Sequence, residues 1–136
     1  CLHSLDRPEL AAALQRESEK KNVESVSCLV EINSTGEDTK AGVALNGAAD
    51  FVRSLSDFSR IRVKGLMTIG PFTDDGARID DAFRRVRDLR EMFREQFPGM
   101  DWNMLSMGMS QDYRAAIRFG ATVLRIGSLV FGARPR

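Results

Sequence analysis

The chain alternates between short apolar segments and longer segments in which apolar residues recur every three or four positions. The short segments have the length and composition of buried strands, and the longer ones have the spacing of amphipathic helices. The pattern predicts strands at residues 2–5, 26–32, 61–69, 102–107 and 122–126. It predicts helices at residues 7–20, 45–58, 79–97 and 111–119, and a short apolar turn at residues 129–131.

This order is a strand followed by a helical segment, five times over. Strands separated by covering helices form a parallel sheet with right-handed crossovers. Five units in 136 residues give about 27 residues each, and eight such units need about 218, which is within the range of a TIM barrel. We therefore expect an α/β fold in which residues 1–136 are a single domain. We expect this domain to correspond to roughly strands four to eight of a parallel TIM-type barrel with their helices, without the N-terminal three units.

Local signals set the expected helix ends. Asp6, with Glu9 three residues on, has the pattern of a capping box at the first helix. The polar face of the helix at 79–97 is expected to be solvated and to carry ion pairs along the helix. Asp74 and Asp75 precede that helix in a turn-rich stretch without a further cluster of metal ligands, so a solvated loop is expected there.

The residues best suited to bind a ligand lie at the ends of the last two strands. The strand before Gly108 breaks there and is expected to enter a helix at Ser110, whose hydroxyl suits an N-cap or a ligand oxygen. The next strand ends in Gly127 and Ser128. Both turns lie at the same end of a parallel sheet, where backbone N–H groups gather and favour anions. Arg125 is expected on the same face as Gly127. An ordinary turn with a capping serine remains an equal alternative.

The composition limits the function classes. A hydrophobic fraction of 43% and a charged fraction of 29% are typical of a globular protein, and a net charge of +1 does not favour nucleic acid or an anionic membrane. We expect no membrane partner, because no apolar run approaches the roughly 20 residues of a membrane span. Cys1 and Cys28 are too few for a disulfide framework, and Cys28 is expected to be a buried, inert thiol. These features favour the cytoplasm.

The stretch LSMGMSQDYRAAIRFGATVLRIGSLVFGARP, residues 105–135, resembles the C-terminal signature of the YggS/PROSC family of pyridoxal phosphate (PLP) homeostasis proteins. Members of that family are fold-type III PLP barrels related to the N-terminal domain of alanine racemase. The resemblance implies that Met109 packs near the cofactor ring and that Ser110, Gly127 and Ser128 hold the phosphate. It also implies that Arg125 faces the pyridine nitrogen. The family most often has Thr at the place of Ser128, which keeps a hydroxyl.

Two further segments resemble the family. The polar loop from Asn33 to Gly42 matches its Asn-x-x-x-Glu-x-x-Lys-x-Gly pattern, with Glu37 and Lys40 in the matching places. We favour a structural role for that charged pair. Gly65 begins a Gly-Leu-Met run that also resembles the family.

The family's first three strands have no counterpart in the chain. The lysine that forms the Schiff base to PLP belongs to that part of the family's barrel. None of the lysines present is assigned that role. They are Lys20, Lys21, Lys40 and Lys64.

The resemblance implies PLP binding and cofactor homeostasis by a carrier or regulator rather than an enzyme. An alternative is an amino-acid racemase of the alanine-racemase type. Another is a phosphate-binding barrel enzyme without PLP, since the last barrel strands often build phosphate sites. The expected partners are PLP or phosphate, and either the missing N-terminal barrel segment or a second copy. Metal ligands are not predicted.

Overall fold

A computed structural model describes residues 1–37 and 39–132 of the chain. Five strands follow one another across the sheet in the order β1-β2-β4-β5-β6, and the two-residue strand β3 pairs with β2 off this path. The strands are β1 (Leu2–Leu5), β2 (Val26–Asn33), β3 (Val43–Ala44), β4 (Ile61–Met67), β5 (Met104–Met109) and β6 (Val123–Arg125). The helices are α1 (Pro8–Lys20), η1 (Leu45–Gly47), α2 (Ala48–Ser54), η2 (Leu55–Asp57), α3 (Gly76–Gln96), α4 (Tyr113–Arg118) and α5 (Ser128–Phe131).

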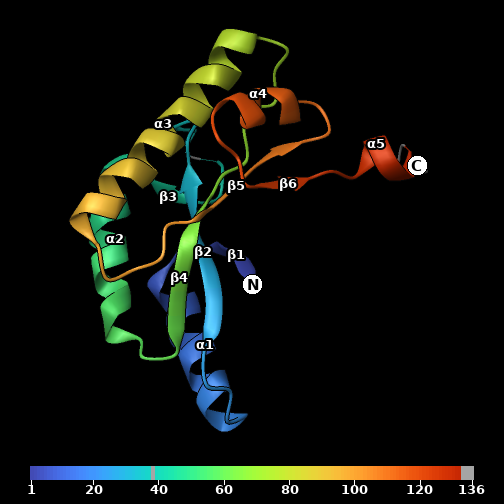
Figure 1. Ribbon diagram of the computed structural model, residues 1–136. Helices are drawn as coiled ribbons and strands as arrows, with labels where there is room; N and C mark the ends of the chain where they lie inside the picture. Colours follow the sequence, from blue (N-terminus) through green and yellow to red (C-terminus); the bar gives the residue numbers. More distant parts are fainter. Residues whose placement is uncertain (38, 133–136) are drawn as a thin grey trace.

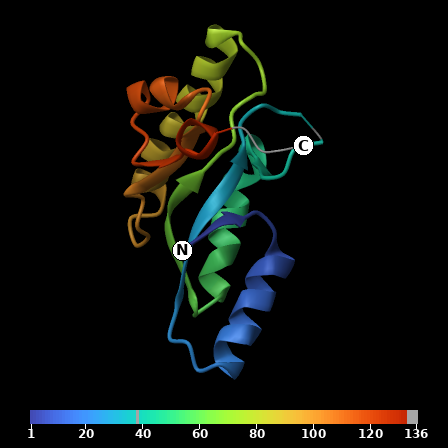
Figure 2. The ribbon, with the colours of Figure 1, turned by 90° about the vertical axis from the view of Figure 1, so that its right-hand side faces the viewer.

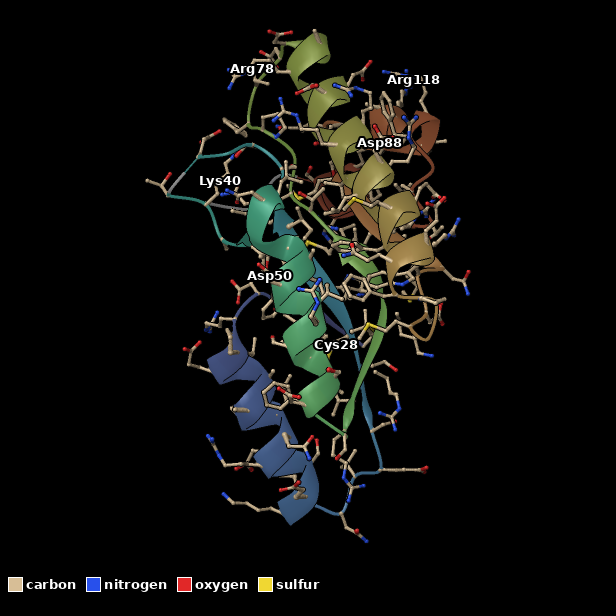
Figure 3. The ribbon with its side chains drawn as sticks, turned by 90° about the vertical axis from the view of Figure 1, so that its left-hand side faces the viewer. Cys28, Lys40, Asp50, Arg78, Asp88 and Arg118 are labelled. Atoms are coloured by element: carbon tan, nitrogen blue, oxygen red, sulfur yellow. The ribbon has the colours of Figure 1, made fainter. Side chains whose placement is uncertain are left out.

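Every strand pairing is parallel, and the sheet curls into part of a barrel (Figure 1). Helices α1, α2 and α3 lie across one face of the sheet, as Figure 3 shows from that side. Figure 2 looks onto the other face, in front of which lie the N-terminus and α5. The predicted partial TIM-type barrel is therefore confirmed.

The main core lies between the sheet and its helices. Phe83 and Phe93 of α3 are fully buried against Leu105 and Met107 of β5. Because successive side chains of a strand point to opposite faces, Ser106 between them turns to the open face. The alternation that predicted a strand thus also places one polar residue of β5 on the side away from the helices.

Cys28 of β2 is fully buried in this core, labelled beneath the helices in Figure 3. Burial, the largest effect, raises the pKa of its thiol to about 11. The predicted burial of this thiol is confirmed, and its raised pKa favours the protonated, less reactive form.

Gly65 allows β4 to pass close to β5. Its φ of +146° is a backbone conformation that side chains disfavour, and a Cβ there would lie 1.8 Å from the carbonyl oxygen of Met104. The register of β2 against β4 shifts at the same place, so that Cys28 pairs with Val63 but Leu29 pairs with Gly65. The extra residue makes a bulge and increases the local curl of the sheet.

The starts of two helices differ from the expected ones. Arg7, not Asp6, occupies the N-cap of α1, and Asp6 accepts a hydrogen bond from the Arg7 guanidinium at 2.6 Å instead of capping the helix. Helix α3 begins at Gly76 rather than at residue 79, and Asp75, in the exposed loop that was expected, is its N-cap. Its side chain accepts hydrogen bonds from the amides of Ala77 and Arg78 and so satisfies two N–H groups that the helix leaves free.

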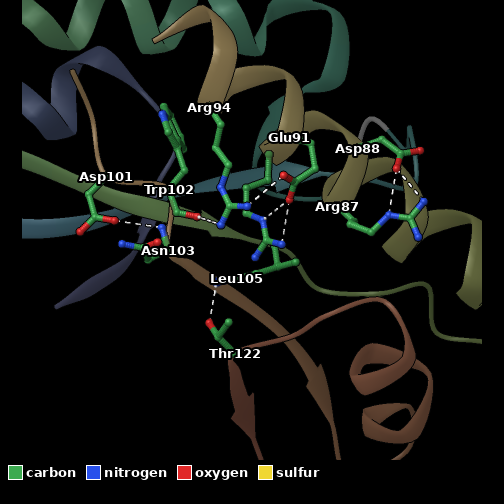
Figure 4. A network of polar contacts seen from close by, with 10 residues as sticks. Arg87, Asp88, Glu91, Arg94, Asp101, Trp102, Asn103, Leu105 and Thr122 are labelled. Atoms are coloured by element: carbon green, nitrogen blue, oxygen red, sulfur yellow. Dashed lines mark hydrogen bonds and ion pairs between the residues drawn. The ribbon is translucent and has the colours of Figure 1, made fainter. Parts of the chain in front are cut away.

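The charged face of α3 is mostly solvated, as predicted, and its ion pairs include Arg85 with Asp81 at 2.6 Å. Arg90 departs from that prediction, because it is buried, with 8% of its surface exposed, while donating to Glu91. Figure 4 shows Arg94 between Glu91 and the backbone carbonyl of Trp102. Arg94 thereby ties α3 to the segment that leads into β5.

Among the described helices, none combines the length with the apolar character that crossing a bilayer requires. The sequence also predicts a polar tail at Arg134, Pro135 and Arg136, and these residues lie outside the described part of the chain.

Candidate functional site

The turns after β5 and β6 meet, although they are far apart in the sequence. The hydroxyl of Ser110 accepts hydrogen bonds from the amide of Gly127 at 3.2 Å and from the amide of Leu129 at 3.4 Å. Ser128, between those two residues, is the exposed first residue of α5. The structure therefore brings together the three residues predicted at the ends of these strands.

Ser110 does not begin a helix, as the sequence had suggested. Strand β5 continues through Met109, and α4 begins only at Tyr113 with Asp112 at its N-cap. The Ser110 hydroxyl instead links the two turns by accepting hydrogen bonds from the turn after β6. Met109 pairs with Arg125 across the two strands and leaves 41% of its surface exposed at this end of the sheet.

Gly108 allows α4 to pack directly onto this strand end. Its φ is +95°, and a Cβ there would lie 2.6 Å from the Cβ of Ala116 in α4 and 3.0 Å from a methyl carbon of Leu124 in β6. The absence of a side chain therefore brings the turn after β5 close to β6.

Arg125 is fixed by two neutral acceptors. One guanidinium nitrogen donates to the Ser106 hydroxyl at 2.7 Å and the other to the Thr68 carbonyl oxygen at 2.9 Å, so the side chain reaches across β5 to the end of β4. Burial lowers the pKa of Arg125, while the charges of Asp112 and Glu31 act to raise it. Arginine stays protonated in proteins, so the site holds a fixed cation with further N–H donors to offer.

His3 is a neighbour of this cation that the sequence did not reveal. Its Nδ1 lies 3.0 Å from the Ser106 hydroxyl, which already accepts from Arg125. Burial, followed by the charge of Arg125, lowers the pKa of His3, which favours the neutral imidazole. The only signal in the sequence is the polar position of Ser106 within an apolar strand.

Glu31 is a buried carboxyl group on β2. Burial, the largest effect, and the charge of Asp6 raise its pKa, while Arg125 acts to lower it. Together with Lys40 it lines a small cavity of about 140 Å³. An acidic group of raised pKa therefore lies near the same cation.

The loop after β2 is ordered by Asn33. Its side-chain oxygen accepts from the amides of Thr35 and Gly36, and its side-chain nitrogen donates to the carbonyl of Glu37 at 2.8 Å. Glu37 and Lys40 form an ion pair at 3.4 Å. These contacts agree with the structural role favoured for the pair, and Figure 3 labels Lys40 in this loop.

The described residues contain no group of three His, Cys, Asp or Glu side chains that could hold a metal ion. The chemistry of this end of the sheet is that of amide donors, hydroxyl groups and one guanidinium, which suits an anion. The fold is part of a parallel α/β barrel, and the carboxyl ends of its last strands gather Ser110, Gly127, Ser128 and Arg125.

The chain belongs to the family of the alanine racemase N-terminal domain, which matches residues 1–135. It is 38% identical over 133 residues to the pyridoxal phosphate homeostasis protein of Aquifex aeolicus, covering 98% of the chain and 58% of that protein. The resemblance to the PLP homeostasis proteins is thereby confirmed. The chain thus spans less than two thirds of the length of this relative.

The solved structures of PipY from Synechococcus elongatus are similar as well. The structure without PLP has a TM-score of 0.87 at 29% identity and covers 96% of the chain and 60% of PipY. The structure with PLP bound has a TM-score of 0.83 at 28% identity and covers 96% of the chain and 59% of PipY.

Proposed function

We propose that the chain contributes the phosphate and pyridine side of a PLP site and serves in homeostasis of the cofactor. The observation that carries this proposal is the meeting of two turns at Ser110, whose hydroxyl accepts the amides of Gly127 and Leu129 at the ends of the strands that carry Met109 and Arg125. Amide and hydroxyl donors suit a phosphate dianion. The name of the Aquifex relative and the PLP bound in PipY support the choice of ligand.

In this proposal Ser110, Gly127 and Ser128 hold the phosphate and Met109 packs near the cofactor ring. Arg125 donates a hydrogen bond to the pyridine nitrogen. PLP, when bound, offers a pyridine ring that can accept electrons from an attached substrate. A guanidinium cannot accept a proton, so Arg125 keeps the nitrogen unprotonated and weakens that capacity. This suits a carrier or regulator of the cofactor without catalysis of its own.

The chain is proposed to be one domain, the C-terminal portion of an eight-stranded barrel. Both β1 and β6 are edge strands of the described sheet, and an edge strand can pair with further strands. On α5, beside β6, the apolar side chains of Leu129, Val130 and Phe131 are 60%, 67% and 87% exposed. A further segment supplying the remaining strands, or a second copy, would cover them. We call the chain together with that further segment the completed barrel.

We propose a cytoplasmic location for the protein. Cys1 and Cys28 are both free thiols, which a reducing compartment maintains.

PLP titration of the completed barrel tests the binding role. Ser110→Ala combined with Ser128→Ala should weaken PLP binding by at least about tenfold, because a hydrogen bond to a charged group contributes about 1.5–3 kcal/mol. Ser25→Ala, at an exposed position before β2, is the matched control and should bind as the unchanged protein does. Equal affinity in the double variant would contradict the proposed phosphate site.

A further inference from the structure

Asp112 occupies the N-cap position of α4 but does not cap it. No hydrogen bond joins its side chain to the first turn of the helix, although an aspartate there usually accepts from an amide of that turn. Its Oδ1 instead accepts from the amide of Met109, three residues back, at 2.6 Å. The side chain therefore stabilises the turn that precedes the helix.

The backbone closes the same turn from the other side. The amide of Asp112 donates to the carbonyl oxygen of Met109 at 3.1 Å. The four residues from Met109 to Asp112 are thus held by one backbone bond and one charge-assisted bond. Ser110 is the second residue of this closed turn, and its hydroxyl accepts hydrogen bonds from the amides of Gly127 and Leu129.

The second carboxylate oxygen of Asp112 faces the segment after β4. A Cβ at Gly70 would lie 2.8 Å from Oδ2 of Asp112 and 3.2 Å from a ring carbon of Phe83. Phe83 is fully buried in the core and leaves little room to move. A side chain at residue 70 would therefore displace the carboxylate from its contact with Met109.

Asp112 is also a counter-charge to the arginine of the site. Its charge acts to raise the pKa of Arg125 against the effect of burial.

We infer that Asp112 is a positioning residue that closes the Met109–Asp112 turn and so places Ser110 for the phosphate group. This inference rests on the proposed function in its choice of ligand but not in its geometry. The acceptor oxygen is the essential feature, because an asparagine has the same reach and also accepts from an amide.

Three probes separate this role from a general loss of structure in the completed barrel. They are PLP, inorganic phosphate and pyridoxal, which lacks the phosphate. Asp112→Ala should weaken binding of PLP and of inorganic phosphate by about tenfold, as expected for one lost charge-assisted hydrogen bond. It should leave pyridoxal binding unchanged. Asp112→Asn should restore most of the affinity, and Gly70→Ala should reproduce the effect of Asp112→Ala.

Equal losses for PLP and pyridoxal in Asp112→Ala would overturn the inference, because they would indicate a general structural role. No rescue by Asp112→Asn would do the same.

Amide hydrogen exchange in the ligand-free protein tests the geometry without any cofactor. Exchange at Met109, Gly127 and Leu129 should be faster in Asp112→Ala than in Asp112→Asn. Unchanged exchange in Asp112→Ala would overturn the positioning role even if PLP binds. The proposed function would be contradicted if the protein without substitutions bound neither PLP nor phosphate. The exchange result would then still decide the role of Asp112.

Discussion

The hydroxyl of Ser106 lies 2.7 Å from a guanidinium nitrogen of Arg125 and 3.0 Å from Nδ1 of His3. These two contacts join strands β1, β5 and β6 on the face of the sheet away from the helices. Ser106 itself is fully buried beneath them. Arginine can only donate, so the serine oxygen must accept from Arg125. The orientation of the cation therefore depends on a buried serine of the neighbouring strand.

Ser106→Ala should release one end of Arg125. The guanidinium would keep its bond to the Thr68 carbonyl but lose the hydroxyl, and PLP binding to the completed barrel should weaken a few-fold. The side-chain N–H resonances of Arg125 should broaden or exchange faster with water. Ser4→Ala, at an exposed position of β1, is the control and should leave both observables unchanged. Unaltered Arg125 resonances in Ser106→Ala would show that the serine does not orient the arginine.

Gly65→Ala should be among the most destabilising single changes in the chain. The new Cβ would meet the Met104 carbonyl at 1.8 Å, and the positive φ adds backbone strain, so the free energy of unfolding should fall by about 3 kcal/mol or more. Gly47→Ala is a matched control, because a Cβ there meets nothing within 4 Å and its φ of −97° suits alanine. Urea unfolding of the two variants measures the difference, and similar stabilities would contradict the close approach of β4 and β5.

The two thiols should differ in reactivity. Cys28 is fully buried with a pKa of about 11, whereas Cys1 is exposed. Because the thiolate is the reactive form, a thiol reagent at neutral pH should label Cys1 quickly and Cys28 only after unfolding. Mass spectrometry of the labelled peptides distinguishes the two sites. Rapid labelling of Cys28 in the folded protein would mean that the core around β2 opens readily.

His3 should make folding less favourable in mild acid. Its folded-state pKa is lowered below the ordinary value of 6.5, so the unfolded chain binds its proton first as the pH falls. The free energy of unfolding should therefore decrease below about pH 6.5, and His3→Gln should lack that part of the decrease. Glu31 has a raised pKa and contributes in the opposite direction, with stability gained as the pH falls through its folded-state value. Identical pH profiles of the unchanged protein and His3→Gln would contradict the lowered pKa.

Most of the fold could be predicted because burial repeats along the chain in patterns that the sequence shows directly. Leu105 and Met107 marked a strand, and Phe83 and Phe93 marked the buried face of the longest helix. The meeting of Ser110 with Gly127 followed from the rule that parallel strands end at the same edge of a sheet.

Contacts between distant segments could not be predicted from the same patterns. His3 and Ser106 are 103 residues apart, and only the curl of the sheet brings them together. The burial of Arg90 also depends on tertiary packing, since its position on the helix suggested a solvated face. The start of α4 was missed because Ser110 and Asp112 both suit an N-cap, and the choice depends on which side chain the neighbouring turn requires.

Amide resonances followed during ligand titration test the central claim most directly. In the completed barrel, labelled with ¹⁵N, PLP and inorganic phosphate should both shift the amides of Ser110, Gly127, Ser128 and Leu129, and only PLP should also shift the side-chain resonances of Arg125. Binding of PLP with these amides unmoved, or with shifts confined to another part of the chain, would contradict the proposed site.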